Sequence, residues 1–221
     1  MPLRMDDYPD NSPLISPELE RQLSQLFDKL TCPVSLVCMI GEDTKSSEMA
    51  SFLRHITKLS PQLSCAFYAP GEESDLDAQL DSAFLPATGI YSGGEFGRMV
   101  FHGVPGGQEI TSFAAALLNA GRAARPLDRY TKKDIGRIRE PLNIQVCVSL
   151  GCHHCAQLVL HTQRIAWENS MVTSHMIDAN LYPSLVERYQ IQRVPMTVLN
   201  GETVISGGKT MMELTTLLAK L

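Results

Sequence analysis

The sequence has no excess of basic residues, because 19 Lys and Arg stand against 24 Asp and Glu, which gives a formal net charge of -5. Surfaces that bind nucleic acid or anionic membranes carry clustered positive charge, so we expect neither partner. The chain also lacks an apolar run long enough for a transmembrane helix. Its start, Met1–Asp7, carries acids where a secretory signal would be apolar. We therefore expect a cytoplasmic protein.

Cysteines are few, but two of the six are spaced C-x-x-C, at Cys152 and Cys155. In a reducing cytoplasm such a pair is typical of catalysis or metal binding rather than of a static disulfide. The remaining composition, 44% apolar and 19% charged over 221 residues, is that of a globular protein long enough for two domains. The pair is therefore the first candidate for chemistry.

The pattern of apolar residues predicts a mixed α/β protein in which one order of elements occurs twice. In the first half we expect helices and strands at 16–30 (helix), 34–40 (strand), 44–59 (helix), 63–68 (strand), 75–83 (helical or irregular), 87–101 (hairpin) and 109–120 (helix). After a polar linker, 121–129, the second half repeats them at 132–139 (helix), 143–149 (strand), 155–169 (helix), 171–178 (strand), 182–189 (helix), 196–206 (hairpin) and 211–221 (helix).

The two halves align at a constant offset. Cys152 lies 109 residues after Asp43, and Pro195 lies 109 residues after Pro86. Asp43 and Ser46 take the places of the two cysteines in the first half, and these side chains cannot form a disulfide. We therefore predict two domains, 1–121 and 122–221, of which only the second is redox-active.

The motif Cys152-His153-His154-Cys155 follows a predicted buried strand and opens a predicted helix. The free N–H groups and the dipole at a helix start favour a thiolate, so Cys152 is the candidate nucleophile. Cys155, one turn further along, would resolve the mixed disulfide. The two histidines can add positive charge or hydrogen bonds, and we place His153 among the residues that contact a partner.

Zinc binding is the alternative use of such a pair. A zinc site needs two further ligands at metal-like spacing, and the sequence has no second C-x-x-C and no H-x-H, although His161 on the same predicted helix can be recruited. Redox chemistry is favoured, and no bound metal is expected. Cys38, Cys65 and Cys147 lie in apolar strands and are expected in the core, while Cys32 before Pro33 is expected to be partly exposed.

Val194-Pro195 precedes the second hairpin. A cis-proline beside a dithiol removes an N–H and leaves an open backbone edge for an extended segment of a substrate, which Val194 would offer. We therefore predict a cis bond here and assign Val194 and Pro195 to substrate binding.

Taken together, these features resemble the N-terminal domain of the flavoprotein subunit of bacterial alkyl hydroperoxide reductase, a pair of thioredoxin-like folds, and more distantly the tandem protein disulfide oxidoreductases. The likeness covers nearly the whole chain. The segments that carry it are Leu30-Thr31-Cys32-Pro33-Val34, Gly107-Gln108-Glu109-Ile110-Thr111-Ser112, Ser149-Leu150-Gly151-Cys152-His153-His154-Cys155 and Val194-Pro195.

The resemblance implies a dithiol–disulfide oxidoreductase that passes electrons from a thioredoxin-reductase-like flavoprotein to a peroxiredoxin or another disulfide protein. It also implies that Glu109 accepts and returns the proton of the resolving thiol; otherwise Glu109 is an acid stabilised at a helix start. Because the sequence shows no dinucleotide-binding portion, we expect FAD and NAD(P)H to act only through a separate reductase. The alternatives are a general protein disulfide reductase or isomerase and a zinc-binding interaction module.

Overall fold

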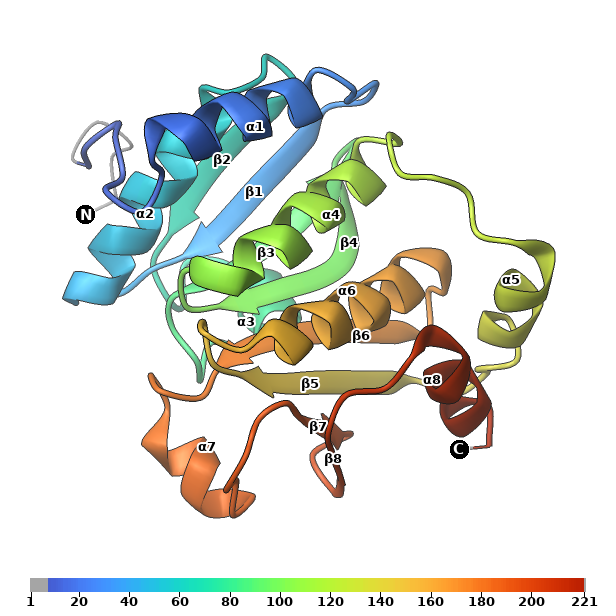
Figure 1. The fold of residues 1–221 in the computed structure, drawn as a ribbon. Coiled ribbons are helices and arrows are strands. Elements are labelled where there is room, and N and C mark those ends of the chain that lie inside the picture. Colours follow the sequence, from blue (N-terminus) through green and yellow to red (C-terminus); the bar gives the residue numbers. More distant parts are fainter. Residues whose placement is uncertain (1–7, 221) are drawn as a thin grey trace. The chain divides into compact units, whose positions relative to one another are not determined.

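The structure, a computed structural model, describes residues 8–220, so the acidic start Met1–Asp7 and Leu221 lie outside the described residues. The mixed α/β fold and the repeated order of helices and strands are confirmed (Figure 1). The chain divides into two compact units. The first holds the described residues up to Val104 together with Leu117–Ala123, and the second holds Pro105–Ala116 and the chain from Ala124 onward.

The first unit contains a four-stranded sheet in the order β2-β1-β3-β4. β1 and β2 are parallel, while β3 runs antiparallel to both β1 and β4. Its elements are α1 (Pro17–Phe27), β1 (Val34–Met39), α2 (Thr44–Thr57), β2 (Leu63–Tyr68), α3 (Ser74–Leu80), β3 (Ala87–Ser92) and β4 (Glu95–His102). Strand β1 buries Val34, Leu36, Cys38 and Met39, while Ser35 and Val37 are only partly buried.

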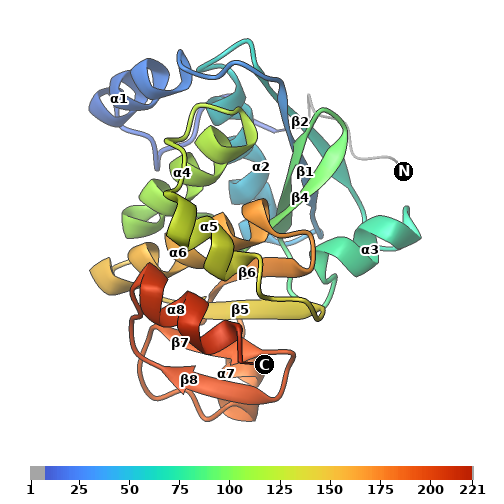
Figure 2. The ribbon, with the colours of Figure 1, turned by 90° about the vertical axis from the view of Figure 1, so that its right-hand side faces the viewer.

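The second unit repeats this sheet in the order β6-β5-β7-β8, with β5 and β6 parallel and β7 antiparallel to β5 and β8. Figures 1 and 2 show its elements. They are a 3₁₀ helix η2 (Gly107–Glu109), the part of α4 (Ile110–Ala120) before Leu117, α5 (Arg129–Ile135), β5 (Leu142–Val148), α6 (His153–Glu168), β6 (Val172–Asp178), α7 (Pro183–Arg188), β7 (Met196–Leu199), β8 (Thr203–Ser206) and α8 (Met211–Leu218). Helix α6 packs on β5 and β6, so the sheet supports the helix that carries the motif.

Side-chain caps explain the starts of α1, α2, α5 and α8. The Ser16 side chain accepts a hydrogen bond from the Leu19 N–H, and Pro17 occupies the first turn of α1. Thr210 and Glu213 form a reciprocal capping box at the start of α8. In the second hairpin, Asn200 and Gly201 have φ values of 50° and 73°, the left-handed conformation that this pair adopts in tight turns.

Several predicted helix boundaries were wrong. The helix expected at 16–30 ends at Phe27, and the helix expected from Cys155 begins at His153. The helix expected at 132–139 begins at Arg129, because Asp128 accepts hydrogen bonds from the Tyr130 and Thr131 N–H groups and so starts the helix inside the predicted linker. The helix expected from Glu109 begins at Ile110, and Glu109 ends the preceding 3₁₀ turn. Within residues 8–220 we find no helix that is both long enough and apolar enough to cross a membrane.

Candidate functional site

Cys152 and Cys155 are joined by a disulfide, with their Cα atoms 5.4 Å apart. The two cysteines differ in exposure, because Cys152 is partly exposed while Cys155 is fully buried. Cys152 is therefore the more accessible residue of the pair. This asymmetry suits a nucleophile followed by a resolving thiol.

The start of α6 provides the environment of Cys152. Cys152 occupies the N-cap position of α6, and its own N–H donates to the Ser149 carbonyl 2.9 Å away, which closes the turn after β5. The Cys152 side chain makes no capping hydrogen bond at this helix start. A thiolate at Cys152 therefore sits where the free N–H groups and the helix dipole stabilise negative charge.

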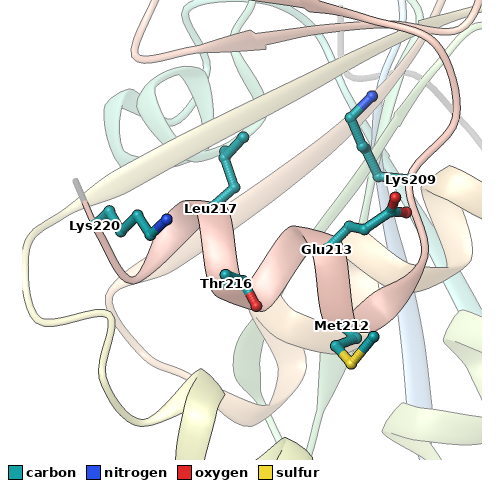
Figure 3. Close-up of a pocket in the computed structure, with 6 residues that line it drawn as sticks. All are labelled: Lys209, Met212, Glu213, Thr216, Leu217 and Lys220. Atoms are coloured by element: carbon teal, nitrogen blue, oxygen red, sulfur yellow. The ribbon is translucent and has the colours of Figure 1, made fainter.

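The two histidines of the motif are both exposed. His154 lines a surface pocket of about 380 Å³ together with residues of α6, of the segment 208–210 and of α8, among them Lys209 and Glu213. A neighbouring pocket of about 410 Å³ follows α8 and is lined by Met212, Leu217 and others (Figure 3). No cysteine or histidine lines this second pocket, so we do not assign the redox site to it although it is the larger of the two.

Val194 and Pro195 form the loop that faces the disulfide. The Val194–Pro195 peptide bond is cis, as predicted. The Cys152 Sγ lies 4.0 Å from the Val194 carbonyl oxygen, and the Pro195 carbonyl accepts a hydrogen bond from the Gly207 N–H at 3.0 Å. The loop is thus tied to the segment after β8, and Val194 remains partly exposed beside the sulfur.

In the first unit, Asp43 and Ser46 take the places of the two cysteines, and they form hydrogen bonds at the start of α2. The Asp43 side chain accepts hydrogen bonds from the Lys45 and Ser46 N–H groups at the start of α2. The Ser46 hydroxyl donates to Asp43 Oδ2 at 2.7 Å and also accepts from the Gly41 N–H at 2.9 Å. The Leu85–Pro86 bond is cis, like its counterpart. Asp43 and Ser46 therefore cap α2, and they contain no sulfur that could form a disulfide.

Glu109 is completely buried. Ser112 Oγ lies 2.5 Å from Glu109 Oε2, and none of residues 8–220 provides a hydrogen-bond partner for Oε1. Burial raises the pKa of the Glu109 carboxyl to about 7; the Ser112 hydrogen bond opposes this rise and the charge of Asp178 adds to it. A carboxyl with a pKa near neutrality can both accept and return a proton.

The segment that carries Glu109 is attached to the loop before Cys152. The Gln108 N–H donates to the Leu150 carbonyl at 2.8 Å, and α6 packs against η2. Gly107 has a φ of +55°, and a Cβ atom added there would collide with the Leu150 carbonyl oxygen. Only glycine fits this close approach without strain.

Replacing Gly107 with alanine should lower the free energy of unfolding by roughly 2–4 kcal/mol, because the left-handed backbone and the collision both cost energy. Gly71 is the matched control, since its φ is +81° but nothing in the described part of the chain lies within 4 Å of an added Cβ. Gly71→Ala should cost only about 1–2 kcal/mol, from the backbone alone. Urea unfolding measures both. Equal losses would show that Gly107 is not pressed against Leu150.

The other cysteines are suited to packing. Burial raises the pKa of the Cys38 and Cys147 thiols to about 12, so neither forms a thiolate near neutral pH. Cys38, Cys65 and Cys147 are buried and Cys32 is partly exposed, as predicted.

Within the described part of the chain, no group of three or more His, Cys, Asp or Glu side chains is arranged to hold a metal ion. His161, the third ligand considered for zinc, lies with its Nδ1 3.1 Å from the Lys209 carbonyl oxygen.

The sequence analysis assigned no role to Ser112 or Asp178. In the structure both residues affect the pKa of Glu109. Ser112 lies three residues after Glu109, and this spacing places two side chains on one face of a helix. That spacing was the available signal for Ser112. Nothing in the sequence pointed to Asp178, which approaches Glu109 only in the folded chain.

Comparisons with known proteins agree with this geometry. The thioredoxin domain family matches residues 142–219. The F component of the alkyl hydroperoxide reductase of Staphylococcus aureus is 29% identical over 203 residues, and a Bacillus subtilis protein named NADH dehydrogenase is 27% identical over 201 residues. Each match covers 91% of this chain but only 37% of the relative. The chain thus spans little more than a third of the length of these relatives.

Solved structures match over a larger share of their length. The N-terminal domain of the alkyl hydroperoxide reductase AhpF of Enterococcus faecalis superposes with a TM-score of 0.87 and 31% identity, covering 92% of this chain and 99% of that one. A protein disulfide oxidoreductase of Aeropyrum pernix reaches 0.81 at 18% identity, covering 93% of this chain and 92% of that one, which shows a shared fold. The chain therefore belongs to the family of the N-terminal domain of the alkyl hydroperoxide reductase AhpF, and it is a thiol–disulfide oxidoreductase of the thioredoxin fold.

Proposed function

We propose that this chain relays electrons from a thioredoxin-reductase-like flavoprotein to a peroxiredoxin or another disulfide protein. The observation that carries the proposal is the disulfide between a partly exposed Cys152 and a buried Cys155 at the start of α6. The family supports the choice of partners, since the relatives include a component of alkyl hydroperoxide reductase.

The exchange proceeds in two steps. The Cys152 thiolate attacks one sulfur of the partner's disulfide, so a mixed disulfide forms and the partner's other sulfur leaves as a thiolate that takes up a proton. Cys155 then gives its proton to Glu109 and attacks the Cys152 sulfur. This attack breaks the bond between Cys152 and the partner, and the partner's second sulfur leaves as a thiolate that takes a proton from solvent. The partner thus departs with two thiols and two more electrons, while Cys152 and Cys155 are oxidised to the disulfide.

Recognition of the partner is assigned to the loop beside the sulfur. Val194 offers its backbone to an extended segment of the partner, Pro195 shapes that loop, and His153 contacts the partner from the exposed start of α6. The 4.0 Å distance between Cys152 Sγ and the Val194 carbonyl supports this placement, because a segment paired with Val194 would bring its own sulfur to Cys152.

The flavoprotein returns the chain to the dithiol form by the reverse exchange. FAD and NAD(P)H act only there in this proposal, and no cofactor is assigned to residues 1–221. We assign residues 1–121 and 122–221 to two thioredoxin-like domains, of which the second performs the exchange. Glu109 precedes residue 122 in the chain, but it lies in the compact unit that holds the disulfide. The cytoplasm is the compartment in which the dithiol would be kept reduced.

A reconstituted assay tests the proposal. A thioredoxin-reductase-like flavoprotein, NAD(P)H, a peroxiredoxin and a hydroperoxide should consume NAD(P)H only when this chain is added, and Cys152→Ser should abolish the consumption. Reduction of insulin by dithiothreitol with no acceleration of the peroxiredoxin system would overturn the relay in favour of a general disulfide reductase. Stoichiometric zinc in the reduced protein, with no exchange activity, would favour the binding module.

A further inference from the structure

Ser112 is fully buried one helical turn after Glu109 and makes two close contacts with it. Its hydroxyl oxygen lies 2.5 Å from Glu109 Oε2 and 2.9 Å from the Glu109 main-chain carbonyl oxygen. The hydroxyl carries one hydrogen, which it donates to one of these two oxygens or shares between them. No other hydrogen bond to the Glu109 carboxyl is present within residues 8–220.

The two carboxyl oxygens of Glu109 therefore differ. Oε2 has a hydrogen-bond partner in Ser112, whereas Oε1 is buried with none among the described residues. An unsatisfied buried acceptor usually costs free energy, and such an atom in a native structure calls for a functional explanation. Oε1 is the atom at which a proton can arrive without first breaking a hydrogen bond.

The segment that holds Glu109 and Ser112 packs against the helix that follows Cys152. Gln108 is hydrogen-bonded to the Leu150 carbonyl, two residues before Cys152, and η2 packs against α6, which carries both sulfurs. Glu109 and Ser112 both lie in Pro105–Ala116, which forms part of the same compact unit as the disulfide.

We propose that Ser112 is a positioning residue that holds Glu109 by Oε2, so that Oε1 alone exchanges the proton with the dithiol. This inference rests on the proposed function, in which Cys155 loses a proton before it attacks. In that step the S–H bond of Cys155 breaks and an O–H bond forms at Oε1. When the disulfide is reduced again, the proton returns from Oε1 to the Cys155 sulfur.

The ionisable group whose charge acts on Glu109 is Asp178, at the end of β6. The negative charge of Asp178 raises the pKa of Glu109, because it opposes ionisation of this carboxyl. The Ser112 hydrogen bond lowers the pKa, because it favours the ionised carboxylate. Ser112 thereby also keeps Glu109 ionisable near neutral pH. Loss of its hydroxyl should make Glu109 a carboxyl that holds its proton more strongly.

The first test is the titration of Glu109 in Ser112→Ala. Carbon-13 NMR of the side-chain carboxyl, in the disulfide form that the structure describes, should show the pKa of Glu109 rising by about one pH unit relative to wild type. The alkaline shift should reappear in the pH dependence of Cys155 attack. Ser46→Ala is the matched control, because it removes a similar hydroxyl-to-carboxylate hydrogen bond in the first unit and should leave both readouts unchanged.

A double-mutant cycle decides whether Ser112 acts through Glu109. In the Glu109→Gln background, Ser112→Ala should cause no further change in the pH profile of Cys155 attack. An unshifted pKa of Glu109 in Ser112→Ala, or equal effects of the substitution in both backgrounds, would overturn the inference. The failure of the proposed function looks different, because wild type would then fail to transfer electrons in the reconstituted assay whatever occupies position 112.

Discussion

Replacing Cys155 with serine should convert the protein into a trap that holds its partner through a mixed disulfide at Cys152. The partly exposed Cys152 keeps its place at the start of α6 and can still attack, but the buried sulfur that would release the partner is gone. Turnover should fall by roughly 10³-fold or more, as expected when a residue of a catalytic unit is removed. Non-reducing electrophoresis and mass spectrometry should show a disulfide-linked complex with the peroxiredoxin.

The controls for this result use the other cysteines. Cys152→Ser should lose turnover to the same extent and trap nothing, because the reachable nucleophile is absent. Cys32→Ser removes a partly exposed thiol outside the motif and should change neither trapping nor turnover. A complex linked through Cys155 in the Cys152→Ser variant would contradict the order of attack that we propose.

Replacing Glu109 with glutamine should slow the attack of Cys155 on the mixed disulfide by about 10²-fold or more, the usual contribution of a positioned general base. Labelling Cys152 with thionitrobenzoate isolates this step, because attack by Cys155 releases a coloured product. In wild type the rate should rise with an inflection near pH 7, as the Glu109 carboxyl loses its proton. That inflection should be missing in Glu109→Gln, and an identical profile would make Glu109 a structural acid.

Glu109→Gln should slow the reaction, but it should stabilise the folded chain at alkaline pH. Burial raises the pKa of Glu109 from an ordinary value of 4.5 to about 7, so the folded chain binds more protons than the unfolded chain between these values. The free energy of unfolding should therefore fall as pH rises through this window, by up to about 3 kcal/mol. Glutamine carries no charge to bury, so at pH 8 Glu109→Gln should be more stable than wild type. A stability difference that does not vary between pH 5 and pH 8 would contradict the buried ionisation.

Much of the fold could be predicted because its signals are local. The hairpin strands at 196–199 and 203–206 agree with the structure because Asn200-Gly201 specifies a tight turn between two short apolar segments. The start of α1 follows from Ser16 and Pro17 for a similar reason. The start of α5 was misplaced because the capping role of Asp128 was not recognised within a segment interpreted as a linker.

The sequence by itself determined that two cysteines would lie at the first turn of a helix, because a buried strand, a short turn and a C-x-x-C pair are all encoded within about a dozen consecutive residues. Only the tertiary structure decided which cysteine is the more exposed, since the partial exposure of Cys152 and the burial of Cys155 depend on what packs around them. The tertiary structure also places Val194 beside Cys152, although the two are 42 residues apart in the sequence. It buries Glu109 completely, in surroundings of low dielectric constant. The pKa of a carboxyl is set by its surroundings rather than by its neighbours in the chain, so no sequence pattern could have placed it near 7.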